Sequence, residues 1–421
     1  MKSQSNIQTL TDLQSKVMDD ISISGTMDNS MAFNEINQWH FHNANASTIK
    51  TPTVLIHGYA ASSMAYYKTF RYLTGSIKDL YTIDLPGFGL SASPKIIIND
   101  HNRKKSQFDI KLIDSKDSNN NKFSISKKNL KLLENGNIED KAFISAFDDY
   151  YIDRIEKWRK FNNLGKINVI GHSFGGYISF KYAIKYPDSI ENLCLVSPFG
   201  MESNVYSINN YDDWKEKFSN PSSTRTSSVS SLGSSNSILN DSGTKIFKTN
   251  SDTDTQLELD LVDPTSKYYF REKVVPGVLF NNQFNVLKCM GPLGSKLTWS
   301  FISRRYEHIA SEAYQNFLFK LFATVPNVTI NNFSNMFTRN LLAKDPIMDS
   351  INKLQSKKLL LFYGENDWMN KEAGFLMAEK LNILKGDSKY ANWIEVPNSG
   401  HNLILDDPKF FSKNLIDFLS S

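Results

Sequence analysis

Short apolar segments alternate along the chain with longer stretches in which apolar residues recur at helical spacing. The apolar segments, each bounded by turn residues, predict buried strands at residues 53–58, 80–87, 167–173, 193–198, 358–367 and 392–401. The stretches between them predict helices, the clearest at residues 147–164, 174–187 and 406–419. Because strands that alternate with helices form parallel sheets covered on both faces, we expect an α/β fold with a mostly parallel sheet flanked by helices.

Two polar segments and one aromatic segment interrupt this alternation. Residues 95–141 are rich in Lys and Asn and are predicted to form a polar insertion. Eleven serines fall within residues 219–242, a composition that cannot supply a packed core, so we expect a disordered segment over about 219–256. Aromatic residues are frequent between about 257 and 350, and this segment is predicted to belong to a mostly helical cap over the sheet.

These interruptions divide the expected fold into three parts. Residues 1–199 are predicted to form the first part of the α/β core, residues 200–350 the helical cap, and residues 351–421 the second part of the core. A chain of 421 residues is long enough for an enlarged domain of this kind.

The composition excludes several classes of protein. The formal net charge of +4 at pH 7 is too small for a dedicated nucleic-acid-binding protein of this size. Cys194 and Cys289 cannot form a disulfide framework, so a reducing, intracellular compartment is expected. No apolar run approaches the length that spans a bilayer, and the N-terminus lacks a signal-peptide core. We therefore expect a protein that is not secreted and that meets membranes only peripherally.

The stretch NVIGHSFGGYISF at residues 168–180 carries the first chemical signal. It places Ser173 in a Gly-X-Ser-X-Gly pattern between a predicted strand and a predicted helix. Such a turn is sharp, strains the backbone of the serine and exposes its hydroxyl, and glycines are needed where strand and helix backbones approach closely. The pattern predicts a nucleophilic serine, although an ordinary glycine turn would fit the local sequence too.

The sequence also supplies the partners that a serine nucleophile requires. A histidine must accept the hydroxyl proton, and a carboxylate must orient that histidine. Asp367 and His401 each follow a predicted strand, in the chain order Ser, Asp, His that this kind of fold uses. We therefore predict a catalytic triad of Ser173, Asp367 and His401.

An oxyanion hole and two supporting residues complete the predicted site. We assign the two oxyanion donors to the backbone N–H groups of Tyr59 and Phe174, with Ala60 as the alternative to Tyr59. His57 is predicted to shape its loop by hydrogen bonds to the backbone. Asp84, in a Pro-Gly turn after an early strand, is predicted to be structural and not the triad acid.

Together these motifs resemble the α/β-hydrolase superfamily: HGY at 57–59, DLPGFGLS at 84–91, GHSFGG at 171–176, GENDWM at 364–369 and GHNLILD at 400–406. Further segments resemble the subfamily that contains an animal lipid-droplet lipase co-activator, a fungal cardiolipin-specific deacylase and a fungal lysophosphatidic acid acyltransferase, and the last of these is the most similar. These segments are INQWHFHN, TPTVLIHGYAASSMA, KINVIGHSFGGYISFKYAIKYPDSIE and RNLLAKDPI.

The resemblance implies a serine-dependent acyl-transfer enzyme of glycerophospholipid metabolism. Its substrates would be a phospholipid or a lysophospholipid, with acyl-CoA as a candidate donor, and it would need no cofactor. Water as acceptor would make it a phospholipase or cardiolipin deacylase, and a lysolipid would make it a lysophosphatidic acid acyltransferase. The resemblance also suggests the mitochondrion, with the cytosol or the lipid droplet as alternatives. Two other functions stay open: a lipid-surface protein that activates another lipase, and a carboxylesterase for small substrates.

Three weaker signals complete the sequence analysis. The subfamily is noted for a His-X4-Asp acyltransferase motif, present here as His401 and Asp406. Asp406 and Asp407 both precede Pro408, so either can N-cap the last helix, and capping is the preferred interpretation of Asp406. WHFH at 39–42 is predicted to be an edge strand, and no metal is assigned because no third ligand is apparent. Arg304 and Arg305 are candidates to meet anionic headgroups, or they belong to a solvated face.

Overall fold

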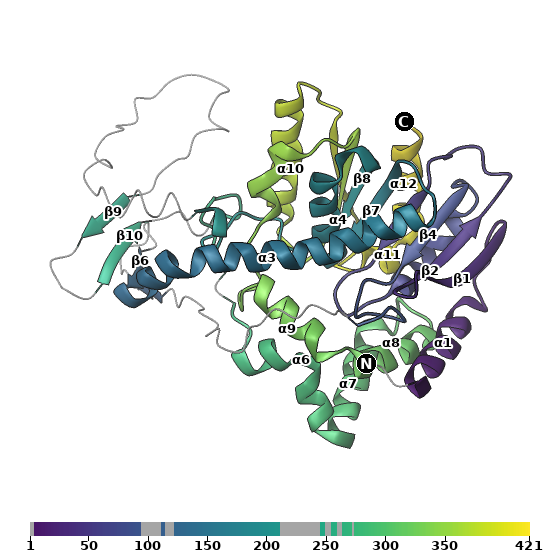
Figure 1. Ribbon diagram of the computed structural model, residues 1–421, viewed down its shortest axis with the longest axis horizontal. Helices are drawn as coiled ribbons and strands as arrows, with labels where there is room; N and C mark the ends of the chain where they lie inside the picture. The colour runs from purple at the N-terminus through teal and green to yellow at the C-terminus, as the bar shows by residue number, and fades with distance from the viewer. Residues whose placement is uncertain are drawn as a thin grey trace.

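The computed structural model describes residues 4–93, 111–113, 122–210, 245–248, 254–258, 263–271 and 273–421. About half of the predicted polar insertion and most of the predicted Ser-rich segment lie outside these residues. The expected α/β architecture is confirmed, because an eight-stranded, mostly parallel sheet lies between layers of helices (Figure 1).

The main sheet has the strand order β1-β2-β4-β3-β7-β8-β11-β12. Only β1 with β2 and β2 with β4 pair antiparallel, and all other neighbours are parallel. The carboxyl ends of the parallel strands therefore meet at one edge, where sites of this fold class are built. The strands are β1 Thr26–Ala32, β2 Ile36–His42, β3 Thr53–Ile56, β4 Asp79–Ile83, β7 Ile167–His172, β8 Ile190–Val196, β11 Lys358–Gly364 and β12 Ala391–Val396.

Both faces of this sheet are buried. Along β11, Leu359, Leu361 and Tyr363 belong to one hydrophobic core, and Leu360 and Phe362 belong to the other. The first core is closed by α3 Lys127–Phe161, α4 Phe174–Lys185 and α10 Lys371–Lys385. The second is closed by α1 Gln4–Met18, the 3-10 helix η1 Ser63–Thr69, α2 Phe70–Leu73 and α12 Pro408–Ser420.

Four further helices fall in the sequence between the two parts of the core, within the segment predicted to form a cap. They are α6 Gly277–Cys289, α7 Gly291–Tyr306, α8 Glu312–Thr324 and α9 Asn327–Met336. Figure 1 places them together below the sheet, and α8 packs against α1. Side chains from all four helices line cavities beside the carboxyl ends of the strands, as described below.

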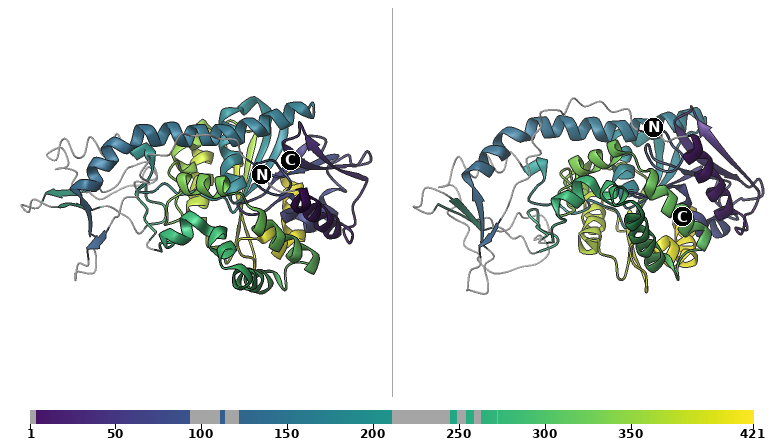
Figure 2. Two further views of the ribbon diagram at one scale, coloured as in Figure 1. Left: turned by 60° about the horizontal axis from the view of Figure 1, so that its bottom comes forward. Right: turned by 90° about the horizontal axis from the view of Figure 1, so that it is seen from below.

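Helix α3 is longer than the sequence predicted. The expected helix covers 147–164, whereas the observed helix begins at Lys127. The prediction starts too late because residues 127–141 are polar in composition and are assigned to the insertion. Figure 2 shows it extending beyond the main body toward a second, antiparallel sheet. The strands of that sheet are β5 Lys111–Ile113, β6 Lys122–Ser126, β10 Asp254–Glu258 and β9 Lys245–Lys248. Strands β9 and β10 lie largely within the segment predicted to be disordered. The prediction is wrong for these strands, because β10 pairs with both β6 and β9.

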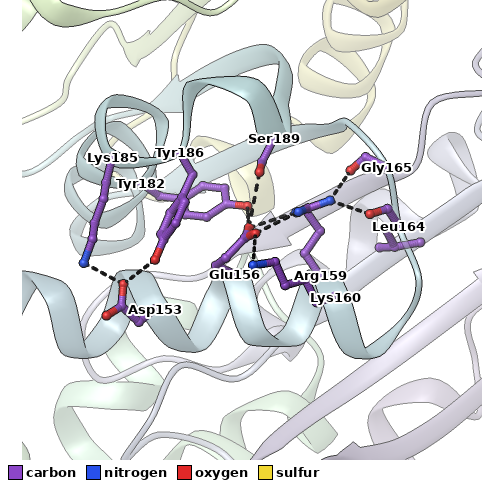
Figure 3. Close-up of polar contacts among 10 residues, drawn as sticks. All are labelled: Asp153, Glu156, Arg159, Lys160, Leu164, Gly165, Tyr182, Lys185, Tyr186 and Ser189. Atoms are coloured by element: carbon purple, nitrogen blue, oxygen red, sulfur yellow. Dashed lines mark hydrogen bonds and ion pairs between the residues drawn. The ribbon is translucent and has the colours of Figure 1, made fainter.

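A buried charge cluster fixes α3 to the helix that follows the candidate nucleophile (Figure 3). Glu156 of α3 accepts hydrogen bonds from the Arg159 guanidinium at 2.7 and 2.9 Å and from the Tyr182 hydroxyl of α4 at 2.8 Å. Burial opposes the charge of Glu156, but Arg159 and Tyr182 outweigh it and lower its pKa to about 2. The cluster therefore holds α4 against α3.

Candidate active site

Ser173 lies at a sharp turn between β7 and α4. Its backbone adopts φ 55° and ψ −118°, a strained conformation for a residue with a Cβ. A Cβ built on Gly171 would lie 2.4 Å from the carbonyl oxygen of Gly175, and one built on Gly175 would lie 2.3 Å from the carbonyl oxygen of His57. The close approach predicted for the two glycines that flank Ser173 is thus confirmed.

The structure brings the three predicted triad residues together from the ends of three strands. His401 Nε2 lies 3.0 Å from Ser173 Oγ, and His401 Nδ1 lies 3.1 Å from Asp367 Oδ1. With the Nδ1 proton donated to Asp367, Nε2 is free to accept the proton of the serine hydroxyl. The arrangement can therefore activate Ser173 as a nucleophile.

The environment of Asp367 keeps its carboxylate charged. The side chain is fully buried, which raises its pKa. The hydrogen bond and charge of His401, together with interactions from Ser197 and Met369, lower the pKa by more, so the net shift is downward. The backbone N–H of Met369 donates to the same carboxylate oxygen at 3.1 Å. A charged Asp367 favours the imidazole tautomer that the serine needs.

His172 is a site residue that the sequence analysis did not single out. Its Nε2–H donates to the carbonyl oxygen of His401 at 2.8 Å. Burial and the neighbouring His401 lower its pKa to about 3, so the ring is neutral. His172 therefore fixes the backbone of the loop that carries His401. The sequence placed it beside the serine but could not show a contact with a residue 229 positions away.

The two residues predicted to supply the oxyanion donors line the same cavity as the serine. Tyr59 and Phe174 line this cavity with Ser173 and His401, and neither backbone N–H forms a hydrogen bond with any residue that the structure describes. Ala60, the alternative donor, follows Tyr59 with φ 56°. The oxyanion role stays a prediction.

The two supporting residues lie as predicted. His57 is buried, its Nε2 accepts from the N–H of Leu85 at 2.9 Å, and its Nδ1–H donates to the Gly58 carbonyl at 2.7 Å. Asp84 is also buried, and its carboxylate accepts from the N–H groups of Ser63 and Leu90. Both side chains are committed to holding the loops around the site.

The N-capping interpretation of Asp406 is wrong. The carboxylate that caps α12 is that of Asp407, which accepts from the N–H of Phe410 at 2.9 Å, because Asp407 directly precedes the first-turn proline. Asp406 ends the short helix α11 Leu403–Asp406, and its Oδ2 accepts from the N–H of Gly400 at 2.8 Å. Asp406 therefore braces the loop before His401, whose ring is oriented by Asp367.

Two cavities open at Ser173 and His401. The first, which we call the apolar cavity, has about 340 Å³ and is lined mainly by aromatic and aliphatic side chains of α6, α9 and the strand ends. The second, the polar chamber, has about 650 Å³ and is lined by side chains of α7, α8 and the loops before and after His401. Trp368 lines both, with its ring 5.2 Å from that of His401. A substrate bound at the serine could thus place an apolar chain in the first cavity and a polar group in the second.

One group of described residues could hold a metal ion, away from this site. Asp79 Oδ1 lies 3.0 Å from His40 Nε2 and 2.8 Å from His42 Nδ1, and the three ligand atoms lie within 4.8 Å of one another. The third ligand was not apparent from the sequence because Asp79 comes from β4, paired with β2. The edge-strand prediction is wrong, since β1 covers the outer side of β2.

Comparison with known proteins assigns the chain to a family. Residues 51–231 match the family described as the alpha/beta hydrolase fold. The chain belongs to this family, and within it to the group around two proteins of Saccharomyces cerevisiae. It is 42% identical to the 1-acylglycerol-3-phosphate O-acyltransferase ICT1, over 99% of this chain and 93% of that protein. It is also 42% identical to Protein ECM18, over 98% of this chain and 80% of that protein.

Solved structures agree with the fold. A bromoperoxidase from Bacillus anthracis superposes with a TM-score of 0.51 at 12% identity, covering 94% of this chain and all of that one. At this identity the likeness concerns the fold alone. Among the described residues, no helix is both long and apolar enough to cross a bilayer.

Proposed function

We propose that this protein is a serine-dependent acyl-transfer enzyme of glycerophospholipid metabolism that uses lysophosphatidic acid as an acyl acceptor. The observation that carries the proposal is the pair of contacts made by His401, at 3.0 Å to Ser173 Oγ and 3.1 Å to Asp367 Oδ1. This is the geometry that general-base activation of a serine requires.

The mechanism follows from these contacts. His401 takes the proton of Ser173 as Oγ attacks the carbonyl carbon of an acyl ester or thioester, and Asp367 stabilises the imidazolium that forms. The N–H groups of Tyr59 and Phe174 hold the developing oxyanion. His401 then protonates the leaving group, which departs and leaves the acyl group on Ser173. The same histidine then deprotonates the acceptor, which attacks the acyl-enzyme and releases the acyl group from Ser173.

The acceptor decides which product is made. With water as acceptor, the product is a free fatty acid, and the reaction is the deacylation of a phospholipid, cardiolipin included. A lysophosphatidic acid hydroxyl gives phosphatidic acid. The 42% identical yeast relative is named a 1-acylglycerol-3-phosphate O-acyltransferase, which supports this acceptor. A direct transfer that uses His401 with Asp406 and bypasses the serine is the alternative mechanism. Phospholipid and acyl-CoA both remain candidate donors.

An exposed apolar surface on α6 and α7 supports contact with a lipid surface. Val278 is 68% exposed, Leu293 57% and Phe301 58%, so these side chains leave large apolar areas in water. Leu279 and Phe301 also line the apolar cavity and the polar chamber, respectively. The surface would thus meet a membrane next to the openings through which lipid must enter. This placement supports the proposal that the protein binds membranes peripherally.

The test compares products made by the purified wild type, Ser173→Ala and Asp406→Asn. Each protein receives a radiolabelled phospholipid or acyl-CoA donor, with and without lysophosphatidic acid. We expect Ser173→Ala to lose free fatty acid and phosphatidic acid together, because both come from one acyl-enzyme. Phosphatidic acid formation that survives in Ser173→Ala and disappears in Asp406→Asn would refute the acyl-enzyme and favour direct transfer.

A further inference from the structure

The charged residues around Ser173 are distributed unequally between the two cavities. The described lining of the apolar cavity contains no Lys, Arg, Asp or Glu. The described lining of the polar chamber contains a single Lys or Arg, namely Arg305, and a single carboxylate, Asp406. A ligand with both an acyl chain and an anionic group would therefore direct the anionic group into the polar chamber.

Arg305 lies next to the general base. It occupies the last turn of α7, and a Cβ built on Gly400, the residue before His401, would lie 3.8 Å from Arg305 Nη2. The guanidinium forms no hydrogen bond or ion pair within 4.0 Å with the residues that the structure describes. Its planar set of donors is thus available to a ligand, and that geometry suits phosphate oxygens.

The carboxylate in the chamber does not cancel this cation. Asp406 accepts the hydrogen bond of Gly400 N–H, and the positive charges of both Arg305 and Lys68 act on it. Lys68 lies close by, with its Nζ 3.4 Å from the carbonyl oxygen of Leu405. Lys68 therefore shares the negative charge of Asp406 with Arg305, so this carboxylate does not fully neutralise the guanidinium. Lys68 itself is not among the residues that line the polar chamber, and the carboxylate of Asp367 also acts on Asp406.

We propose that Arg305 binds the phosphate monoester of the acyl acceptor and so directs the acyl group to a lysolipid instead of water. The proposal rests on the acyl-enzyme proposed above. Lysophosphatidic acid carries a free hydroxyl on the carbon next to the one that bears its phosphate ester. A phosphate held beside Gly400 would bring that hydroxyl to His401.

The transfer step balances without a further reactant. His401 Nε2 takes the proton of the acceptor hydroxyl, the hydroxyl oxygen bonds to the acyl carbon, and the ester bond to Ser173 Oγ breaks. The proton then passes from His401 to Ser173 Oγ. The products are phosphatidic acid and free enzyme.

Arg304 provides a matched control. It precedes Arg305 on the same helix, carries the same charge and is likewise exposed, but it lines neither cavity at Ser173. A general effect of surface charge on lipid binding would affect Arg304→Ala and Arg305→Ala alike. A specific phosphate contact would affect only Arg305→Ala.

The experiment measures how each enzyme partitions its acyl group. Purified full-length wild type, Arg305→Ala, Arg305→Lys and Arg304→Ala are given p-nitrophenyl decanoate as donor. The acceptor is 1-oleoyl-lysophosphatidic acid or, without phosphate, 1-oleoylglycerol. The readout is the ratio of acylated acceptor to free decanoate at increasing acceptor concentration. Because the ratio is internal to each variant, a loss of total activity does not affect it.

We expect Arg305→Ala to lower the ratio for lysophosphatidic acid by about 10- to 100-fold, the range for a charge-assisted hydrogen bond. Arg305→Lys should retain part of it, Arg304→Ala should stay within about twofold, and the ratio for 1-oleoylglycerol should not change in any variant. An unchanged ratio in Arg305→Ala, an equal loss in Arg304→Ala, or no transfer by the wild type would overturn the assignment of Arg305. Loss of p-nitrophenol release in Ser173→Ala tests the acyl-enzyme separately.

Discussion

The substitution Gly175→Ala tests how closely the turn at Ser173 is packed. The new Cβ would lie 2.3 Å from the carbonyl oxygen of His57 and 2.5 Å from that of Ile56. Both oxygens belong to the backbone at the end of β3, so no side-chain rotation can relieve the contact. Since ordinary contacts begin at 3.4 Å, the start of α4 or the end of β3 must move by about 1 Å.

A shift of this size acts on both catalysis and stability. The turn carries Ser173 Oγ and the N–H of Phe174, and a misplacement of about 1 Å at a reacting group costs on the order of 100-fold in rate. Overpacking of a dense interior costs about 1–3 kcal/mol in the free energy of unfolding. We therefore expect Gly175→Ala to remain folded at 25 °C but to lose about 100-fold in turnover.

The assay combines p-nitrophenyl ester hydrolysis with thermal unfolding. Gly165→Ala is the control, because a Cβ built on Gly165 meets no atom within 4 Å, and this variant should match the wild type in both measurements. Wild-type turnover in a folded Gly175→Ala would show that the approach of β3 and α4 does not position the nucleophile.

Three further variants give expected outcomes. Asp367→Asn should lower turnover by about 10⁴-fold, measured at saturating ester, because it favours the wrong tautomer of His401. Burial raises the pKa of Asp148 to about 7, so folding favours its neutral form and stability should fall as pH rises from about 4 to 7. Asp148→Asn should therefore raise the melting temperature at pH 8 and leave it unchanged at pH 4, and equal effects at both would contradict this. The paired change Val278→Glu with Phe301→Glu should weaken sedimentation with phospholipid vesicles at least about tenfold without lowering the melting temperature.

The sequence predicted that Ser173, Asp367 and His401 lie together because the signal for that placement does not depend on detailed packing. Ser173 is set by local glycines, while Asp367 and His401 follow apolar segments that were readable as buried strands. Parallel strands place their carboxyl ends at one edge of the sheet. Three residues that each follow such a strand are therefore expected at the same edge, and the chain order Ser, Asp, His agrees with the fold class. For the cap of α12 the sequence offered Asp406 and Asp407, and the structure selects Asp407, which directly precedes the first-turn proline.

Contacts that depend on strand register or on helix rotation were not readable. Asp79 joins His40 and His42 only through the pairing of β4 with β2. Arg304 and Arg305 are identical side chains at adjacent positions. Only the orientation of α7 shows that Arg305 lines the polar chamber and Arg304 does not. The first part of α3 was missed because a polar helix and a polar insertion have the same composition.

The central claim is that Ser173 carries the acyl group. The most direct measurement mixes the protein with p-nitrophenyl decanoate, quenches the reaction with acid within the first turnover and maps the acyl mass by peptide mass spectrometry. We predict one decanoyl group on the peptide that contains Ser173, and none in Ser173→Ala. Turnover without that adduct, or an adduct on another residue that persists in Ser173→Ala, would contradict the account.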